Sequence, residues 1–132
     1  MISVDTLRRG PSFTIQVVVK DGMHAIIGFI RDELQESERA KVMALLEFVV
    51  EHGPPCNEEK FRHEGHGIYA LKTSNVRLYG FFDGQKKIVL THGFKKHARG
   101  GKKAQTRERE HAERIRQLLV ADRGRREAHD ER

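Results

Sequence analysis

The sequence has few of the features that mark a secreted or membrane protein. Its one cysteine, Cys56, cannot form a disulfide within the chain. The longest near-apolar run, residues 42–50, is interrupted by Glu47 and falls far short of the roughly 20 residues that a membrane span requires. Residues 1–9 lack the apolar stretch of a signal peptide. We therefore expect a cytoplasmic chain without membrane contact, in which Cys56 is an incidental thiol.

Acidic side chains are missing from one long segment. Between Gly84 and Arg107 the chain has eight lysine or arginine residues and no aspartate or glutamate, in a protein of net charge +6. Such an imbalance favours a polyanionic partner. His63 and His66 have a spacing seen in zinc sites, but they lack the cysteine or carboxylate ligands that would complete one. We expect no metal and no cofactor.

The apolar pattern predicts an α+β fold. Alternating apolar residues indicate a strand over 12–19, and helical spacing indicates helices over 24–35 and from an N-cap at Ser37 to Gly53. A loop over 54–65 precedes three strands and a last helix over about 105–120. The predicted order is β-α-α-β-β-β-α, within a domain over 12–120. We expect residues 1–11 to be flexible and the charged tail, 121–132, to be disordered.

Turn lengths predict which side chains share a row across the last three strands. Two-residue turns at Ser74-Asn75 and Gly84-Gln85 would place Lys72 opposite Arg77 and Arg77 opposite His92. Like charges that face each other destabilise a sheet, so this row favours a bound anion such as phosphate. The alternative is that both cations extend into water, and a one-residue change in either turn would break the row.

Three segments carry a resemblance to a known family. They are Ile68-Tyr-Ala-Leu-Lys72, Arg77-Leu-Tyr-Gly-Phe-Phe82 and Leu90-Thr-His-Gly-Phe-Lys-Lys96, the last followed by a basic loop and a helix. With them, residues 12–120 resemble the RelE/HigB-like toxins of bacterial type II toxin–antitoxin systems, specifically the phage-derived branch. The resemblance implies a small, curved antiparallel sheet of the RelE-like fold. It also implies an endoribonuclease that cleaves mRNA on the ribosome and is neutralised by a cognate antitoxin, which we expect to contain a helix-turn-helix domain.

The resemblance also implies roles for individual residues. RNA cleavage by attack of the 2′-OH requires cations that stabilise a dianion and groups that transfer protons. The catalytic candidates are Arg77 as the phosphate clamp, Lys72 at a position where many relatives have arginine, His92 and Lys95. The candidates for RNA binding are Lys96, His97, Arg99, Lys102, Lys103 and Tyr79.

Several of these assignments have alternatives. The ring of His92 could instead be hydrogen-bonded inside the sheet, Tyr79 could belong to the core, and Lys95 could contact the RNA backbone without taking part in chemistry. Lys72 lacks the bidentate fork of arginine, and the chain lacks the near-terminal tyrosine that some relatives use. A second function therefore stays open: an RNA- or partner-binding module of the same fold with weak or no catalysis.

Overall fold

The computed structural model describes residues 1–96 and 101–130, with side chains of the last helix described as far as residue 125. Its elements are β1 (Ile2–Arg9), β2 (Thr14–Lys20), β3 (Met23–His24), α1 (Ala25–Glu33), α2 (Glu36–His52), β4 (Phe61–Gly65), β5 (Ile68–Thr73), β6 (Val76–Phe82), β7 (Lys87–Lys95) and α3 (Gly101–Asp130). Among the described residues, no helix is both long enough and apolar enough to cross a membrane.

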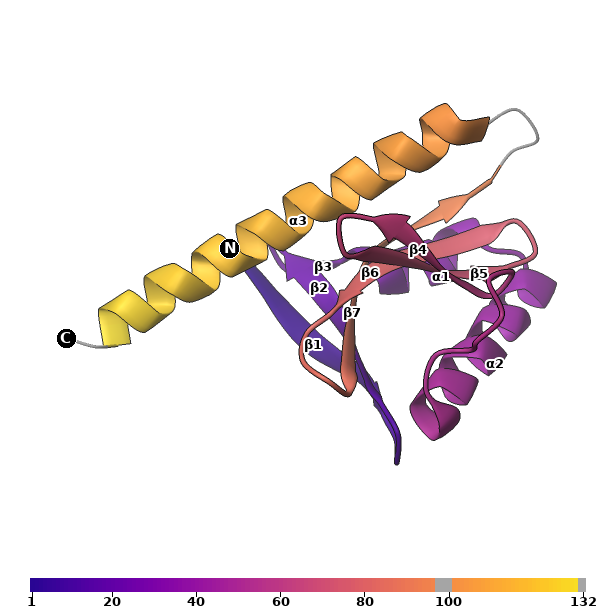
Figure 1. The fold of residues 1–132 in the computed structure, drawn as a ribbon, viewed down its shortest axis with the longest axis horizontal. Coiled ribbons are helices and arrows are strands. Elements are labelled where there is room, and N and C mark those ends of the chain that lie inside the picture. The colour runs from indigo at the N-terminus through magenta and orange to yellow at the C-terminus, as the bar shows by residue number, and fades with distance from the viewer. Residues whose placement is uncertain (97–100, 131–132) are drawn as a thin grey trace.

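One curved sheet organises the molecule, with helices on both of its faces. The strand order is β1-β2-β7-β6-β5-β4, and the short β3 pairs with β2. Neighbouring strands are antiparallel except for β2 and β7, which run parallel. Helices α1 and α2 lie on one side of the sheet and α3 crosses the other (Figure 1). The predicted α+β class and the mainly antiparallel sheet are confirmed.

Strand β1 corrects the prediction of a flexible N-terminus. It pairs with β2 along its length, from Ile2 opposite Lys20 to Arg9 opposite Thr14, and Ile2 is buried. Strand β4 likewise lies where a loop was predicted, and it pairs with β5. Polar and charged residues dominate both strands, so the apolar pattern did not reveal them. Both are edge strands, whose backbone bonds to one neighbour only.

The C-terminal segment also differs from the prediction, because α3 continues through the expected disordered tail to Asp130. Arg123 on this extension forms an ion pair with Asp83 in the β6–β7 turn, at 3.0 Å. Leu119 is buried on the helix side that faces the sheet. The charged sequence therefore forms a helix that is attached to the sheet over most of its described length.

Two apolar cores flank the sheet. The first lies under α1 and α2 and includes Ile26, Phe29 and Leu46; the second lies under α3 and includes Ile68, Phe81 and Leu119. At Gly93 the ring of Phe29 packs so closely on β7 that a Cβ atom would overlap it. Glycine in the Leu90–Lys96 segment is therefore required for α1 to pack against the sheet.

Candidate functional site

The two hairpins around β6 determine which side chains lie together, and only one follows the prediction. Lys72 lies opposite Arg77, as the two-residue turn at Ser74-Asn75 predicted. The β6–β7 turn is one residue wider than the predicted two-residue turn. Asp83 donates its backbone N–H to the carbonyl of Lys87, whereas the prediction paired Asp83 with Lys86. Thr91 then forms a bulge, so that Arg77 lies opposite Phe94, and His92 opposite Tyr79.

The predicted row of Lys72, Arg77 and His92 is therefore wrong. The wider turn and the bulge each shift the register by one residue, and side chains alternate between faces with a period of two. The two shifts together leave His92 on the same face as Arg77 but move it one row along the strands.

Four cations gather at one end of this face: Arg62, Lys72, Arg77 and Lys96, which we call the basic cluster. Burial and then the positive charges of Arg77, Arg62 and Lys96 lower the pKa of Lys72, while Glu64 acts in the opposite direction. Within the described residues, no carboxylate forms an ion pair with any of the four. The cluster thus contains four cations without an ion-paired carboxylate among the described residues, and Glu64 offsets their charge only in part.

Arg77 is positioned by the β5–β6 turn. Its Nη1 donates hydrogen bonds to the backbone carbonyls of Ser74 and Val76, both at 3.1 Å. Lys96 is placed beside the same turn, because its backbone N–H donates to the carbonyl of Asn75 at 2.6 Å. The guanidinium of Arg77 is therefore held in place while its remaining N–H groups are available to an anion.

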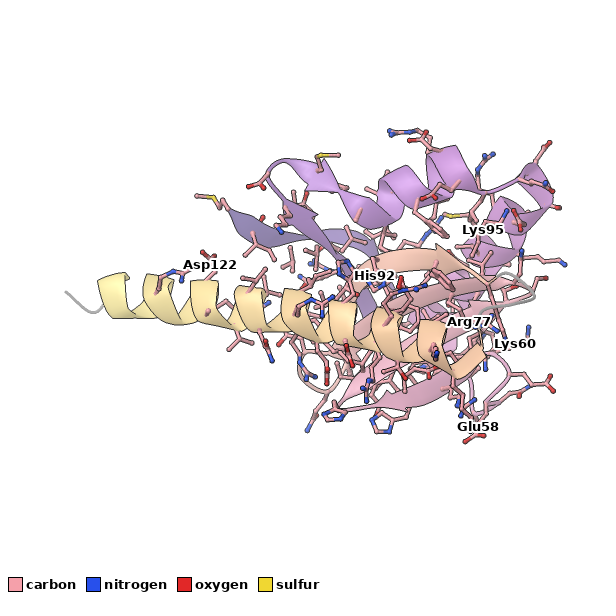
Figure 2. All side chains as sticks on the ribbon, turned by 90° about the horizontal axis from the view of Figure 1, so that it is seen from above. Glu58, Lys60, Arg77, His92, Lys95 and Asp122 are labelled. Atoms are coloured by element: carbon pink, nitrogen blue, oxygen red, sulfur yellow. The ribbon has the colours of Figure 1, made fainter. Side chains whose placement is uncertain are left out.

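His92, by contrast, is buried under α3 (Figure 2). The hydroxyl of Thr91 donates to the carbonyl of Tyr79, so the 3.0 Å contact between that hydroxyl and Nδ1 of His92 requires the ring to donate from Nδ1. Nε2 then faces Glu108 at 3.7 Å, too far for a hydrogen bond. Burial, followed by the nearby His111, lowers the pKa of His92 to about 3. The ring is neutral at physiological pH.

Tyr79 occupies the same covered region. Its ring stacks on His92 with centroids 5.1 Å apart and 1% of the residue exposed, and burial raises its pKa to about 12. With α3 in place, the ring of Tyr79 has no free face on which a base could stack. The structure favours the core alternative for Tyr79.

The remaining predicted residues are Lys95, Lys102 and Lys103, which the structure describes, and two that lie outside the described residues. Lys95 points to the opposite side of the sheet, where its Nζ donates to Glu38 at 2.9 Å (Figure 2). The same carboxylate accepts from the backbone of Gln35, which is the N-cap of α2 in place of the predicted Ser37. Lys102 and Lys103 line an outward groove on α3. His97 and Arg99 lie outside the described residues.

Sequence reasoning missed Arg62 and Glu108. Arg62 was assigned to a loop, but in β4 it lies opposite Ala70 and therefore on the same face as Lys72. Glu108 was overlooked because α3 was recognised only by its apolar residues, whereas this carboxylate faces His92 from the helix. The alternation of apolar Phe61 with charged Arg62 was the one available signal for β4.

Most of the chain, including the residues of this site, matches a known protein family. Residues 31–117 match the family described as phage-derived protein Gp49-like (DUF891). The chain belongs to this family. Gp49-like proteins are RelE/HigB-like toxins, so the predicted resemblance is confirmed at this general level. The match extends from α1 into α3 and includes Lys72, Arg77 and His92. No curated protein is significantly similar to the chain.

Proposed function

We propose that this Gp49-like protein is the toxin of a type II toxin–antitoxin system and an endoribonuclease that cleaves mRNA on the ribosome. The observation that carries this proposal is the basic cluster, four cations without an ion-paired carboxylate among the described residues. Like charges held together in a sheet cost stability, and a bound phosphate would offset that cost.

The arrangement suits cleavage by the 2′-OH of RNA. The 2′-OH loses its proton to a base or to solvent while its oxygen forms a bond to the adjacent phosphorus, the bond from phosphorus to the 5′ oxygen breaks, and the leaving oxygen receives a proton. Arg77, already held by the turn carbonyls, would bind the phosphoryl oxygens as negative charge accumulates on them. Lys72 would donate the proton to the leaving 5′ oxygen, because burial and the neighbouring cations lower its pKa and make it a stronger acid than an ordinary lysine.

We infer the partners, mRNA and an antitoxin, from the positive charge of the basic cluster. Arg62 and Lys96 would bind phosphates on either side of the cleaved one, and mRNA in the ribosome presents such a chain of phosphates. The cognate antitoxin would neutralise the toxin by covering this face with an acidic segment, joined to a helix-turn-helix domain. Both interactions depend on the basic cluster and would weaken as salt increases.

The deciding experiment incubates the purified protein with mRNA and ribosomes and identifies the new RNA ends. We expect fragments with a 2′,3′-cyclic phosphate and a 5′-hydroxyl, and none when mRNA carries 2′-O-methyl groups throughout. Intact RNA after incubation with well-folded protein, both with and without ribosomes, would exclude the nuclease.

One observation favours a second function, an RNA-binding module without cleavage. His92, the histidine of the predicted site, is neutral and covered by α3, so it transfers no proton to a substrate in this conformation. This alternative predicts RNA binding that weakens steeply with salt and yields no products. The cyclic phosphate end distinguishes the two functions.

A further inference from the structure

A second feature lies beside the basic cluster, on the other side of the β5–β6 turn. It is a groove of about 510 Å³ between α2, this turn and the loop before β4. Its lining consists of Lys41, Ala44, Leu45, Phe48, Pro55, Lys60, Thr73 and Ser74. The four α2 residues are spaced as one helix face, and Phe48 is 44% exposed, which is unusual for a phenylalanine.

The chemistry of the lining is an aromatic and apolar floor with a cationic rim. Lys41 and Lys60 are the charged lining residues, and no carboxylate of the described residues contributes to the groove. Glu58 belongs to the same loop as Lys60 but is not part of the lining, and Figure 2 shows it at the edge of the molecule. An aromatic ring with nearby lysines is the combination that binds single-stranded nucleic acid, because bases stack on the ring and phosphates contact the cations.

Ser74 connects the groove to the basic cluster. Its backbone carbonyl accepts a hydrogen bond from Arg77 on one side, and its hydroxyl accepts one from Nζ of Lys41, at 3.2 Å, on the other. Lys60 and Arg77 also lie at the same end of the molecule (Figure 2). A strand of RNA that has one phosphate at Arg77 can therefore continue around the turn into the groove.

We propose that the groove is a nucleotide subsite for single-stranded RNA. A base next to the phosphate bound by Arg77 stacks on Phe48, and the backbone phosphates on that side contact Lys41 and Lys60. This inference rests on the proposed function and adds to it a site for recognition of a flanking base. Its continuity with the basic cluster favours RNA over an acidic peptide as the occupant.

The test measures binding of a fluorescent 2′-O-methyl oligonucleotide, which has the charge of RNA but no 2′-OH to attack, at several salt concentrations. Phe48→Leu, which keeps an apolar side chain, should weaken binding about 5-fold or more without changing the salt dependence. Lys60→Gln should weaken binding and reduce the salt slope by about 0.7. The matched controls, Leu118→Ala at an exposed leucine of α3 and Lys20→Gln at an exposed lysine of β2, should bind like the wild type.

The outcomes separate this inference from the proposed function. Normal binding by Phe48→Leu would overturn base stacking, and normal binding by Lys60→Gln would overturn the phosphate contact; cleavage by the wild type would leave the nuclease standing in either case. If both variants bind the oligonucleotide normally but no longer bind the antitoxin, the groove is a protein-docking site and the inference is wrong. Circular dichroism would verify that each variant is folded.

Discussion

Two neighbouring rows on the sheet face under α3 differ in how far their polar side chains are buried. We call the row of Lys72 and Arg77 the open end and the row of Tyr79 and His92 the covered end. At one end, Arg77 and Lys72 are only partly buried, and charges of their own sign surround them. One row further along the strands, His92 and Tyr79 are buried, stacked on each other and neutral. The difference arises from where α3 covers the sheet.

This contrast gives different roles to Arg77 and His92, which the turn lengths had predicted to lie in one row. A group that binds phosphate has to be open to solvent and charged, which describes Arg77. His92, in contrast, is covered and uncharged, and its ring packs between the sheet and His111 of α3. We therefore interpret the open end as the place of chemistry and the covered end as structural support. Substitutions at the two ends should then affect different measurements.

The largest effect should follow Arg77→Ala. Removal of a donor that stabilises transition-state charge typically lowers the rate by about 10²–10³-fold, so RNA cleavage should fall by that factor. The melting temperature should change little, because the loss of hydrogen bonds to two turn carbonyls accompanies relief from like-charge repulsion. Arg123→Ala, which removes an arginine at the far end of α3, is the matched control and should cleave normally. Equal loss of activity in both variants would remove the distinction between the ends.

The covered end should instead control stability, in a pH-dependent way. The pKa of His92 is about 3 in the folded protein, below its ordinary value of 6.5, so the unfolded chain binds more protons between these values. The free energy of unfolding should therefore rise with pH across this window and fall as pH drops. The contribution of one such histidine reaches about 1.4 kcal/mol per pH unit.

The measurement compares the wild type with His92→Gln by urea unfolding between pH 4 and 7. His111 and Glu108 from α3, which face the ring of His92, remain in both proteins, so the difference in slope isolates this histidine. The variant should have the shallower slope. A steeper slope in the variant would mean that Glu108 stabilises a charged His92, which would contradict its structural role as a neutral ring.

The fold was more predictable than the site because its signals are local. Alternating apolar residues revealed β2, and Gly53 correctly marked the end of α2. The position of His92 depends on a bulge at Thr91 and on a turn one residue wider than expected, and neither has a distinctive sequence. The direction of Lys95 and the burial of Tyr79 depend on which helix covers which face, a tertiary property that strand periodicity does not contain.

The smallest effect should be a gain in stability at the open end. Lys72→Gln removes one of two like charges that face each other across β5 and β6, which should stabilise the fold by about 0.2–1 kcal/mol in urea unfolding. Cleavage should nevertheless decrease, because Lys72 is the proposed proton-transfer group. Lys20→Gln, at an exposed position of β2, should change neither quantity. A variant that is more stable and less active would show that the chain retains this repulsion for its activity, whereas a loss of stability would mean that Lys72 is a structural residue like His92.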